Sequence, residues 1–326
     1  MNQAGRALAH AFGTGALTPQ RAFFLRAELG PFRDVDAEQS FRPEFLRLKQ
    51  AGWRIVPRLE RGTYAQGLLL LTKHKEENFA NIARAWSLLE PDGTLVCAGA
   101  NDDGAASVER QVGKALGLAG SLSKFHCRAF WSNRSKREPP DYWRQLAELQ
   151  PVGDGSWLSQ PGVFSWDHVD DGSALLASHL PDDLSGRVAD FGCGWGYLAR
   201  QVLARSPAVS GIDLIDAEHR AIEAARANVI DSRARFDWLD LAREAAPAMY
   251  DAIVCNPPFH AGRAAEPELG QSLIAAAARS LKPGGRFYMV ANRGLPYEGP
   301  LKMNFASVQT LTDNGKFRVT VSIRQH

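Results

Sequence analysis

The sequence predicts an α/β fold that is built twice along one chain. In the second half, apolar runs alternate with helix-like segments, which favours a mainly parallel sheet with helices on both faces. A helix, a turn containing proline and glycine, and a buried strand follow one another in the same order in both halves. The chain has 326 residues, 45% of them hydrophobic, and is therefore long enough for two domains that each have a core.

The boundary between the two domains is expected near residue 150. The segment from Pro139 to Gly155 is punctuated by proline and glycine. Residues 1–155 carry 21 Lys and Arg against 17 Asp and Glu, a net +4, whereas the remainder carries 17 against 19. The first half is thus compatible with a nucleic-acid partner, and equally with an ordinary solvated surface. We expect domains of residues 1–150 and 151–326.

The elements of the second domain follow from its apolar runs. Helix-like segments lie between the runs, most clearly at residues 197–205, 217–228 and 269–281. The expected strands are residues 187–190, 209–215, 234–239, 251–255 and 286–291.

An internal repeat supports two related domains. The turn Pro91-Asp92-Gly93 in the first half corresponds to Pro283-Gly284-Gly285 in the second, and a helix precedes each turn. Where the second half has Asn256 to Phe259, the first half has Thr72 to Lys75, and no acidic residue followed by three alternating glycines precedes residue 150. We therefore expect the first domain to be a degenerate copy that binds substrate or supports the second.

A glycine-rich loop follows the first predicted strand of the second domain. Asp190 ends this strand, and the glycines that follow let the backbone turn tightly and approach a ligand. A dinucleotide fingerprint, G-x-G-x-x-G, requires a glycine at position 197, where Tyr197 stands. The pattern favours S-adenosylmethionine, whose ammonium group the loop and the nearby carboxylate can receive. The candidate cofactor residues in this segment are Asp190, Gly192, Gly194 and Gly196.

Two further carboxylates are candidates for the same cofactor. Asp216 ends the next strand, where its two oxygens can accept both ribose hydroxyls. Asp213 competes with it but lies inside the strand, and capping of the following helix is the structural alternative for either residue. Asp240 is placed to meet the adenine edge, and Asp237 could substitute for it.

The segment Asn256-Pro257-Pro258-Phe259 predicts the chemistry. An exocyclic amine on a purine is a poor nucleophile, because its lone pair is delocalised into the ring. The Asn256 side-chain oxygen and the Pro257 carbonyl can each accept one N–H of such an amine, and consecutive prolines hold the turn rigid. Phe259 can stack on the base, which contributes about 1–3 kcal/mol. We expect methyl transfer to a planar nitrogen by positioning, with no metal and no strong general base.

The cysteine pattern and the apolar composition predict where in the cell the protein is located. The four cysteines are scattered without C-x-x-C spacing, which fits free thiols in a reducing compartment. No apolar stretch approaches the roughly 20 residues of a membrane span, and the amino terminus has no signal-peptide pattern. We expect a soluble cytoplasmic protein with no membrane partner.

These motifs resemble the class I S-adenosylmethionine-dependent methyltransferases of the small methyltransferase group, and most of all the ribosomal RNA small subunit methyltransferase C family. The resemblance covers roughly residues 65 to 326, although Trp195 is bulkier than the small residue usual between those glycines. Beyond the two main motifs it rests on residues 161–165 (PGVFS), 171–173 (DGS), 282–285 (KPGG), 291–292 (AN) and 295–297 (LPY).

The resemblance implies a duplicated Rossmann-like class I methyltransferase fold with a degenerate N-terminal copy. It also implies N2-methylation of a guanine, with ribosomal RNA or the small ribosomal subunit as partner, and we expect a monomer. Phe164 and Ser173 would approach the cofactor or the target base. Adenine N6 or a protein glutamine remains an alternative acceptor. A non-catalytic RNA-binding or ribosome-assembly factor is a further alternative, against which the intact Asp190, Asn256 and Phe259 argue.

Overall fold

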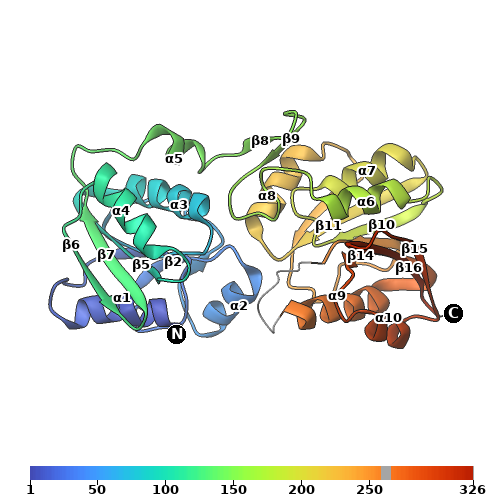
Figure 1. Cartoon of the computed structure of the whole chain (residues 1–326), viewed down its shortest axis with the longest axis horizontal. Helices are drawn as coiled ribbons and strands as arrows, with labels where there is room; N and C mark the ends of the chain where they lie inside the picture. Colours follow the sequence, from blue (N-terminus) through green and yellow to red (C-terminus); the bar gives the residue numbers. More distant parts are fainter. Residues whose placement is uncertain (258–265, 326) are drawn as a thin grey trace. The chain divides into compact units, whose positions relative to one another are not determined.

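The computed structural model describes residues 1–257 and 266–325 (Figure 1). The chain forms two compact units. Unit 1 comprises Met1–Gln150 and Gln160–Gly162, and unit 2 comprises Pro151–Ser159 and Val163–His326. A short two-stranded sheet of β8 (Gln150–Val152) and β9 (Trp157–Ser159) lies where the chain leaves unit 1.

Unit 1 is built on a seven-stranded sheet with the order β3-β2-β1-β4-β5-β7-β6. Its strands are parallel except for β7, which runs antiparallel to both neighbours. The strands are β1 (Ala22–Leu25), β2 (Val35–Glu38), β3 (Ile55–Val56), β4 (Tyr64–Leu70), β5 (Leu89–Ala100), β6 (Gly120–Lys124) and β7 (Cys127–Asn133). The helices are α1 (Gln3–Gly13), α2 (Arg42–Gln50), α3 (Lys75–Leu88), α4 (Ala105–Ala115) and α5 (Asp141–Gln145).

Unit 2 repeats this sheet, with the order β12-β11-β10-β13-β14-β16-β15 and only β16 antiparallel to its neighbours. The strands are β10 (Gly186–Phe191), β11 (Val209–Asp216), β12 (Ala234–Trp238), β13 (Tyr250–Cys255), β14 (Leu281–Asn292), β15 (Ser307–Asp313) and β16 (Phe317–Ile323). The helices are α6 (Asp171–His179), α7 (Tyr197–Arg205), α8 (His219–Asn228), α9 (Glu266–Ser280) and α10 (Glu298–Asn304).

The two sheets share details beyond strand order. The pairing of β4 with β5 is irregular just after Tyr64, and the pairing of β13 with β14 is irregular just after Tyr250. Each tyrosine donates its hydroxyl to an aspartate two strands away in the same sheet, Tyr64 of β4 to Asp36 of β2 at 3.0 Å and Tyr250 of β13 to Asp213 of β11 at 2.7 Å. The predicted duplicated α/β fold is therefore confirmed.

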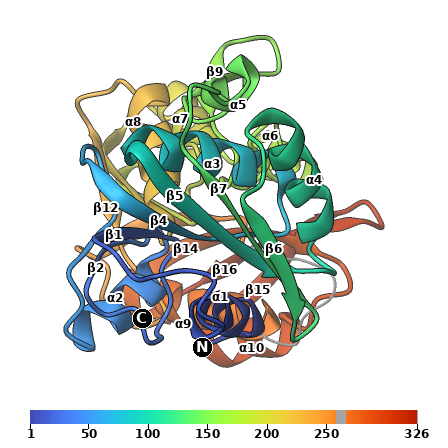
Figure 2. The same ribbon diagram turned by 90° about the vertical axis from the view of Figure 1, so that its left-hand side faces the viewer.

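Helices cover both faces of each sheet. Successive strand residues point to opposite faces, and the apolar side chains on each face pack against helices. In unit 2, Val188 and Val254 pack with α6, α7 and α8, whereas Ala189 and Ile253 pack with α9 and α10. In unit 1, α3 and α4 lie on one face, and α1 and α2 lie on the other (Figure 2).

Most expected elements of the second domain have the predicted positions. The helix of residues 197–205 matches α7 at both ends, whereas α8 begins two residues later than expected and α9 begins before residue 269. The strand β14 begins at Leu281, five residues before the predicted start, because Leu281 already pairs with Tyr250 ahead of the Pro283 turn. Among the described residues, no helix combines the length and the apolar character that a membrane crossing needs.

Candidate active site

Three predicted site residues lie at the carboxyl ends of adjacent strands in unit 2. Asp190 is near the end of β10, Asp216 ends β11, and Asn256 follows β13, and these strands are neighbours in the order β11-β10-β13. Ligands of open α/β sheets bind at this edge. A pocket here is lined by Phe164, Ser165, Asp170, Ser173, Gly192, Cys193, Gly194, Trp195, Tyr197, Leu198 and Asn256.

The glycine-rich loop has left-handed backbone at all three predicted glycines, with φ of 72° at Gly192, 53° at Gly194 and 90° at Gly196. A Cβ atom at Gly194 would meet no described atom within 4 Å, and one at Gly192 would lie 3.9 Å from the Asn256 carbonyl oxygen. These two glycines therefore leave open space that a ligand can occupy. A Cβ atom at Gly196 would instead lie 2.8 Å from Val229 Cγ2, so Gly196 serves close packing.

Asp190 is fully buried beneath the loop, with 0% exposure. Its Oδ2 accepts the backbone N–H of Ala199 at 3.0 Å and so holds the first turns of α7, while Oδ1 has no partner among the described residues. Burial raises the pKa of Asp190 to about 7, the Ala199 N–H opposes this rise, and the negative charge of Asp216 adds to it. The unused buried oxygen is a strong acceptor position.

Asp216 lies beside the loop and binds it directly. Its Oδ2 accepts the Gly194 N–H at 2.9 Å, and its Oδ1 accepts the Glu218 N–H at 2.8 Å. Burial raises the pKa of Asp216 to about 6, although the N–H groups of Glu218 and Gly194 lower it. The competing candidate Asp213 lies elsewhere, because its carboxylate binds Arg187 and the Tyr250 hydroxyl.

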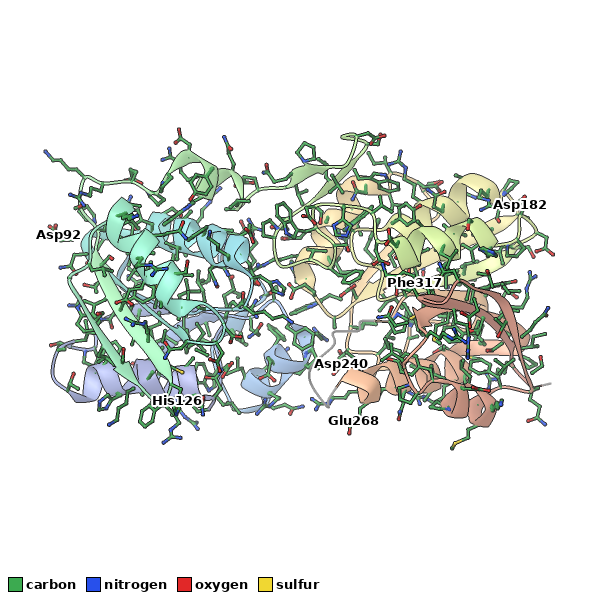
Figure 3. The ribbon with its side chains drawn as sticks, viewed as in Figure 1. Asp92, His126, Asp182, Asp240, Glu268 and Phe317 are labelled. Carbon is green, nitrogen blue, oxygen red and sulfur yellow. The ribbon has the colours of Figure 1, made fainter. Side chains whose placement is uncertain are left out.

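Asp240, labelled in Figure 3, has local partners. Its Oδ1 accepts the Ala242 N–H at 3.1 Å, and its Oδ2 lies 3.8 Å from Arg243 Nε. Asp240 does not line the described pocket. The adenine role predicted for it therefore rests on its place after β12 alone.

Asn256 is a buried polar side chain of the pocket, and it is 8% exposed. Its Nδ2 donates to Asp170 Oδ2 at 2.8 Å and to Ser173 Oγ at 2.8 Å. Its Oδ1 is buried and has no partner in the described parts of the chain. An acceptor is thus held ready at the end of β13. Pro257 is buried next to it, and the predicted residues Pro258 and Phe259 lie outside the described residues.

Phe164 and Ser173, both predicted to approach the cofactor or the target base, line the pocket from different places. Phe164 is 39% exposed at the pocket wall, whereas Ser173 lies in the first turn of α6 and contacts Asn256. The aromatic residue Trp195 donates its Nε1–H to the Ser165 carbonyl at 3.2 Å and packs against Trp157, with ring centroids 5.1 Å apart. Its bulk therefore forms the pocket wall between the glycines.

Sequence reasoning missed Asp170, whose side chain caps the N-terminus of α6 by accepting the Ser173 N–H at 2.8 Å. The pattern of an aspartate shortly before an apolar run signals such a cap. No local signal indicates that the same carboxylate reaches Asn256, which lies 86 residues away.

The equivalent place in unit 1 keeps the backbone and lacks the chemistry. The register aligns Tyr64 with Tyr250, so Leu70 corresponds to Asn256. The predicted correspondence with Thr72 to Lys75 was therefore two residues off. By the same register, Leu68 corresponds to Val254. Phe24 pairs with Leu68, and Asp190 pairs with Val254, so Phe24 is the counterpart of Asp190 and an aromatic ring replaces the carboxylate.

The loop after β1 shows the same loss. The Ala27 N–H donates to the Glu38 carbonyl at 3.0 Å, as the Cys193 N–H donates to Ile215 at 3.1 Å. A single loop joins β1 to β2, whereas β10 is joined to β11 through the glycine-rich loop and α7. Unit 1 thus has no counterpart of α7 among the described residues, and no glycine-rich loop leads into a helix there.

Comparisons with known proteins identify the relatives of this chain. The family described as the methyltransferase small domain matches residues 155–321. The ribosomal RNA small subunit methyltransferase C of Shewanella amazonensis is 31% identical over 244 residues, which cover 72% of this chain and 70% of that protein. The protein of the same name from Psychromonas ingrahamii is 29% identical over 77% of this chain and 74% of its own length.

A solved structure extends the likeness to both units. The T. thermophilus 16S rRNA N2 G1207 methyltransferase, solved in complex with AdoMet and guanosine, matches with a TM-score of 0.80 and 22% identity. The match covers 99% of this chain and 92% of that one. At this identity the likeness concerns the fold, and it includes the duplication.

Proposed function

We propose, because this chain belongs to the ribosomal RNA small subunit methyltransferase C family, that it transfers a methyl group from S-adenosylmethionine to the exocyclic N2 amine of a guanine in ribosomal RNA of the small subunit. The observation that carries the proposal is the environment of the Asn256 side-chain amide. Its oxygen is buried, has no partner among the described residues, and stands at the strand end beside the glycine-rich loop.

The residues of the pocket fit the proposed cofactor. Gly192 and Gly194 leave room for a ligand against the loop, and the carboxyl groups of Asp190 and Asp216 lie beneath and beside it. S-adenosylmethionine supplies an electrophilic methyl group on a positively charged sulfur. Asp216 would accept the ribose hydroxyls, and Phe164 would cover the ligand from the opposite wall. Gly196 contributes by packing α7 close to the sheet.

The target amine is activated by orientation. Asn256 Oδ1 accepts one of its N–H bonds, and the Pro257 carbonyl accepts the other. With both hydrogens fixed, the nitrogen lone pair points away from the two acceptors, towards the methyl group. Transfer would break the methyl–sulfur bond as the C–N bond forms and would leave a neutral thioether. The amine nitrogen, by then positively charged and strongly acidic, would lose its proton to water, so no strong general base is needed.

The alternatives differ in the molecule that carries the planar nitrogen. Adenine N6 and a glutamine amide offer the same two N–H bonds to Asn256, and the family assignment favours guanine. A non-catalytic binding protein would not need an orphaned acceptor oxygen buried at the strand end, since such an oxygen costs stability. The buried Asn256 oxygen, which has no partner among the described residues, therefore favours an enzyme over a binding protein.

Unit 1 is proposed to be the degenerate copy of the fold, which binds RNA or supports unit 2. We also propose that the protein acts as a monomer in the cytoplasm. All four cysteines are buried and free, which suits a reducing compartment. Sedimentation of the purified protein at several concentrations tests the monomeric state.

The test is transfer of labelled methyl groups to small subunits or their RNA, followed by mass spectrometry of the modified nucleosides. We expect N2-methylguanosine. N256A should abolish transfer while cofactor affinity remains within a few-fold. A product on a protein glutamine, with none on RNA, would refute the choice of substrate.

A further inference from the structure

We infer that Asp170 and Ser173 are positioning residues for the transfer, because together they fix which end of the Asn256 amide faces the target amine. This inference rests on the proposed function, in which that amide accepts a hydrogen bond from the amine. Neither residue belongs to the glycine-rich loop or to the Asn256 turn, and both come from the start of α6.

The contacts use the amide nitrogen completely. A side-chain amide nitrogen has two N–H donors, and those of Asn256 reach Asp170 Oδ2 and Ser173 Oγ, each at 2.8 Å. Among the described residues, the oxygen Oδ1 therefore remains the one polar atom of this side chain without a partner. It is the atom that the proposed mechanism requires.

The two partners differ in what they permit. An ionised carboxylate only accepts hydrogen bonds, so Asp170 tolerates the NH₂ end of the amide and repels the oxygen end. A hydroxyl both donates and accepts, so Ser173 satisfies either orientation. Asp170 thus selects the orientation, and Ser173 supports it.

The selection matters because the two orientations have opposite effects on the substrate. In the observed orientation, Asn256 presents an acceptor to the N–H of the incoming amine. After a 180° rotation it would present N–H groups to N–H groups, which would displace the amine from the line of attack. Such misplacement of a reacting group lowers the rate on the order of 100-fold.

Asp170 is itself held firmly. The same Oδ2 accepts the Ser173 backbone N–H at 2.8 Å as the N-cap of α6. On the other side, Phe317 of β16, labelled in Figure 3, packs against the first turn of this helix, where a Cβ atom at Gly172 would lie 3.2 Å from the ring. The helix start therefore carries a rigid carboxylate to Asn256.

The variants that test this inference separate capping from positioning. In D170S the new hydroxyl still caps α6, but it is too short to reach Asn256. In D170N an amide oxygen keeps both the cap and the contact with Asn256. S173A removes the partner that accepts either orientation. D171N is the matched control, because Asp171 is the next residue, is exposed and binds Lys316 instead of Asn256.

We expect D170S to lower kcat by about 10- to 100-fold. D170N and S173A should lower it only a few-fold, and D171N should leave it unchanged. Cofactor affinity and melting temperature should stay close to wild type in all four. Transfer by D170S at the wild-type rate would overturn the inference. So would a loss of cofactor affinity or melting temperature that accounts for the loss of rate, since that would indicate a merely structural role.

A second measurement does not depend on activity. In protein labelled with ¹⁵N at asparagine side chains, the Asn256 NH₂ signals, assigned with N256A, should exchange slowly with solvent in wild type and quickly in D170S. Equal exchange in both would also overturn the inference. If wild-type protein transfers no methyl group to RNA, the proposed function fails on its own, and the exchange measurement still decides whether Asp170 fixes the amide.

Discussion

Arg26 occupies the position in unit 1 that Gly192 occupies in unit 2. Each lies two residues after the paired positions Phe24 and Asp190, and each has a left-handed backbone, with φ of 55° for Arg26 and 72° for Gly192. A glycine adopts this backbone without strain, whereas in an arginine the Cβ atom crowds the backbone and destabilises the conformation. Unit 1 thus shares the backbone conformation of the unit 2 loop at this position and carries a side chain there.

The substitution R26G should destabilise the protein although it relieves this strain. Relief of the left-handed conformation contributes about 1 kcal/mol. The loss of the ion pair with Glu77, whose Oε1 lies 2.6 Å from Arg26 Nη1, costs about 3 kcal/mol, because Glu77 is only 3% exposed. Urea unfolding should therefore show a net loss of about 2 kcal/mol.

The control for R26G is the double variant R26G/E77Q. A neutral amide at position 77 removes the buried charge whose ion pair R26G deletes, so most of the lost stability should return. A single variant as stable as wild type would mean that the Arg26–Glu77 pair does not hold this loop.

The substitution G172A should reduce transfer without unfolding the protein. A Cβ atom at Gly172 would lie 3.0 Å from Asp170 Oδ2, so the carboxylate must shift and its contact with Asn256 must lengthen. Alanine is also the better helix former by about 1 kcal/mol, which offsets the crowding. We expect a several-fold lower kcat, measured with labelled cofactor, and a melting temperature near that of wild type.

Gly299 provides the matched control, because it has the same place in the first turn of α10 and no described atom within 4 Å of a Cβ there. G299A should leave transfer unchanged. Equal rates for G172A and G299A would show that the Asp170 carboxylate has room to move without consequence for the reaction.

The sequence predicted the strands and the loop of unit 2 well, because buried parallel strands appear as apolar runs and the glycines mark the turn between β10 and α7. It could not predict the contact of Asn256 with Asp170, which depends on packing across 86 residues. The role of Gly196 likewise depends on Val229, a neighbour that only the folded chain supplies.

Unit 1 was predicted less completely for a related reason. No motif before residue 60 indicates β1, β2 and β3. Unit 2 has a glycine-rich loop and the carboxylate of Asp190 at the end of β10, whereas this segment has no such loop and carries Phe24 in place of Asp190. The counterpart of Asn256 was misplaced because Thr72 to Lys75 look like a polar strand end. The pairing of β4 with β5 in the folded sheet fixes the register and identifies buried Leu70 as the counterpart.

The substitution N256D should make transfer depend on pH. An aspartate at position 256 would place a carboxylate oxygen where Nδ2 now lies 2.8 Å from Asp170 Oδ2. Two carboxylates so close share one proton, and the pair repels once that proton is lost. The ratio of the kcat of N256D to that of wild type should therefore fall as pH rises from 5.5 to 8.5. N256D/D170N should remove this pH dependence, and a ratio that is flat for N256D alone would contradict the prediction.

Asp190 should make the ligand-free protein less stable as pH rises. Its carboxyl has a pKa of about 7 in the folded protein, above the ordinary value of 3.8, mainly because of burial. Between about pH 4 and pH 7 the unfolded chain has lost this proton while the folded protein retains it. Folding then binds a proton, so the free energy of unfolding falls with increasing pH, by up to about 1.4 kcal/mol per pH unit.

Comparison with D190N cancels the contributions of the titrating groups that the two proteins share, apart from that of Asp216, whose charge interacts with Asp190. The amide keeps an acceptor for the Ala199 N–H and carries no charge at any pH, so the cap on α7 remains. Wild type should therefore lose stability relative to D190N as the pH rises from 4 towards 7, and the difference should level off above that value, where both states of wild type are ionised. Denaturant unfolding at pH 5, 6, 7 and 8 measures it. Parallel stability curves for the two proteins would mean that Asp190 is ionised in the folded protein throughout this range, with a partner for Oδ1 that offsets its burial.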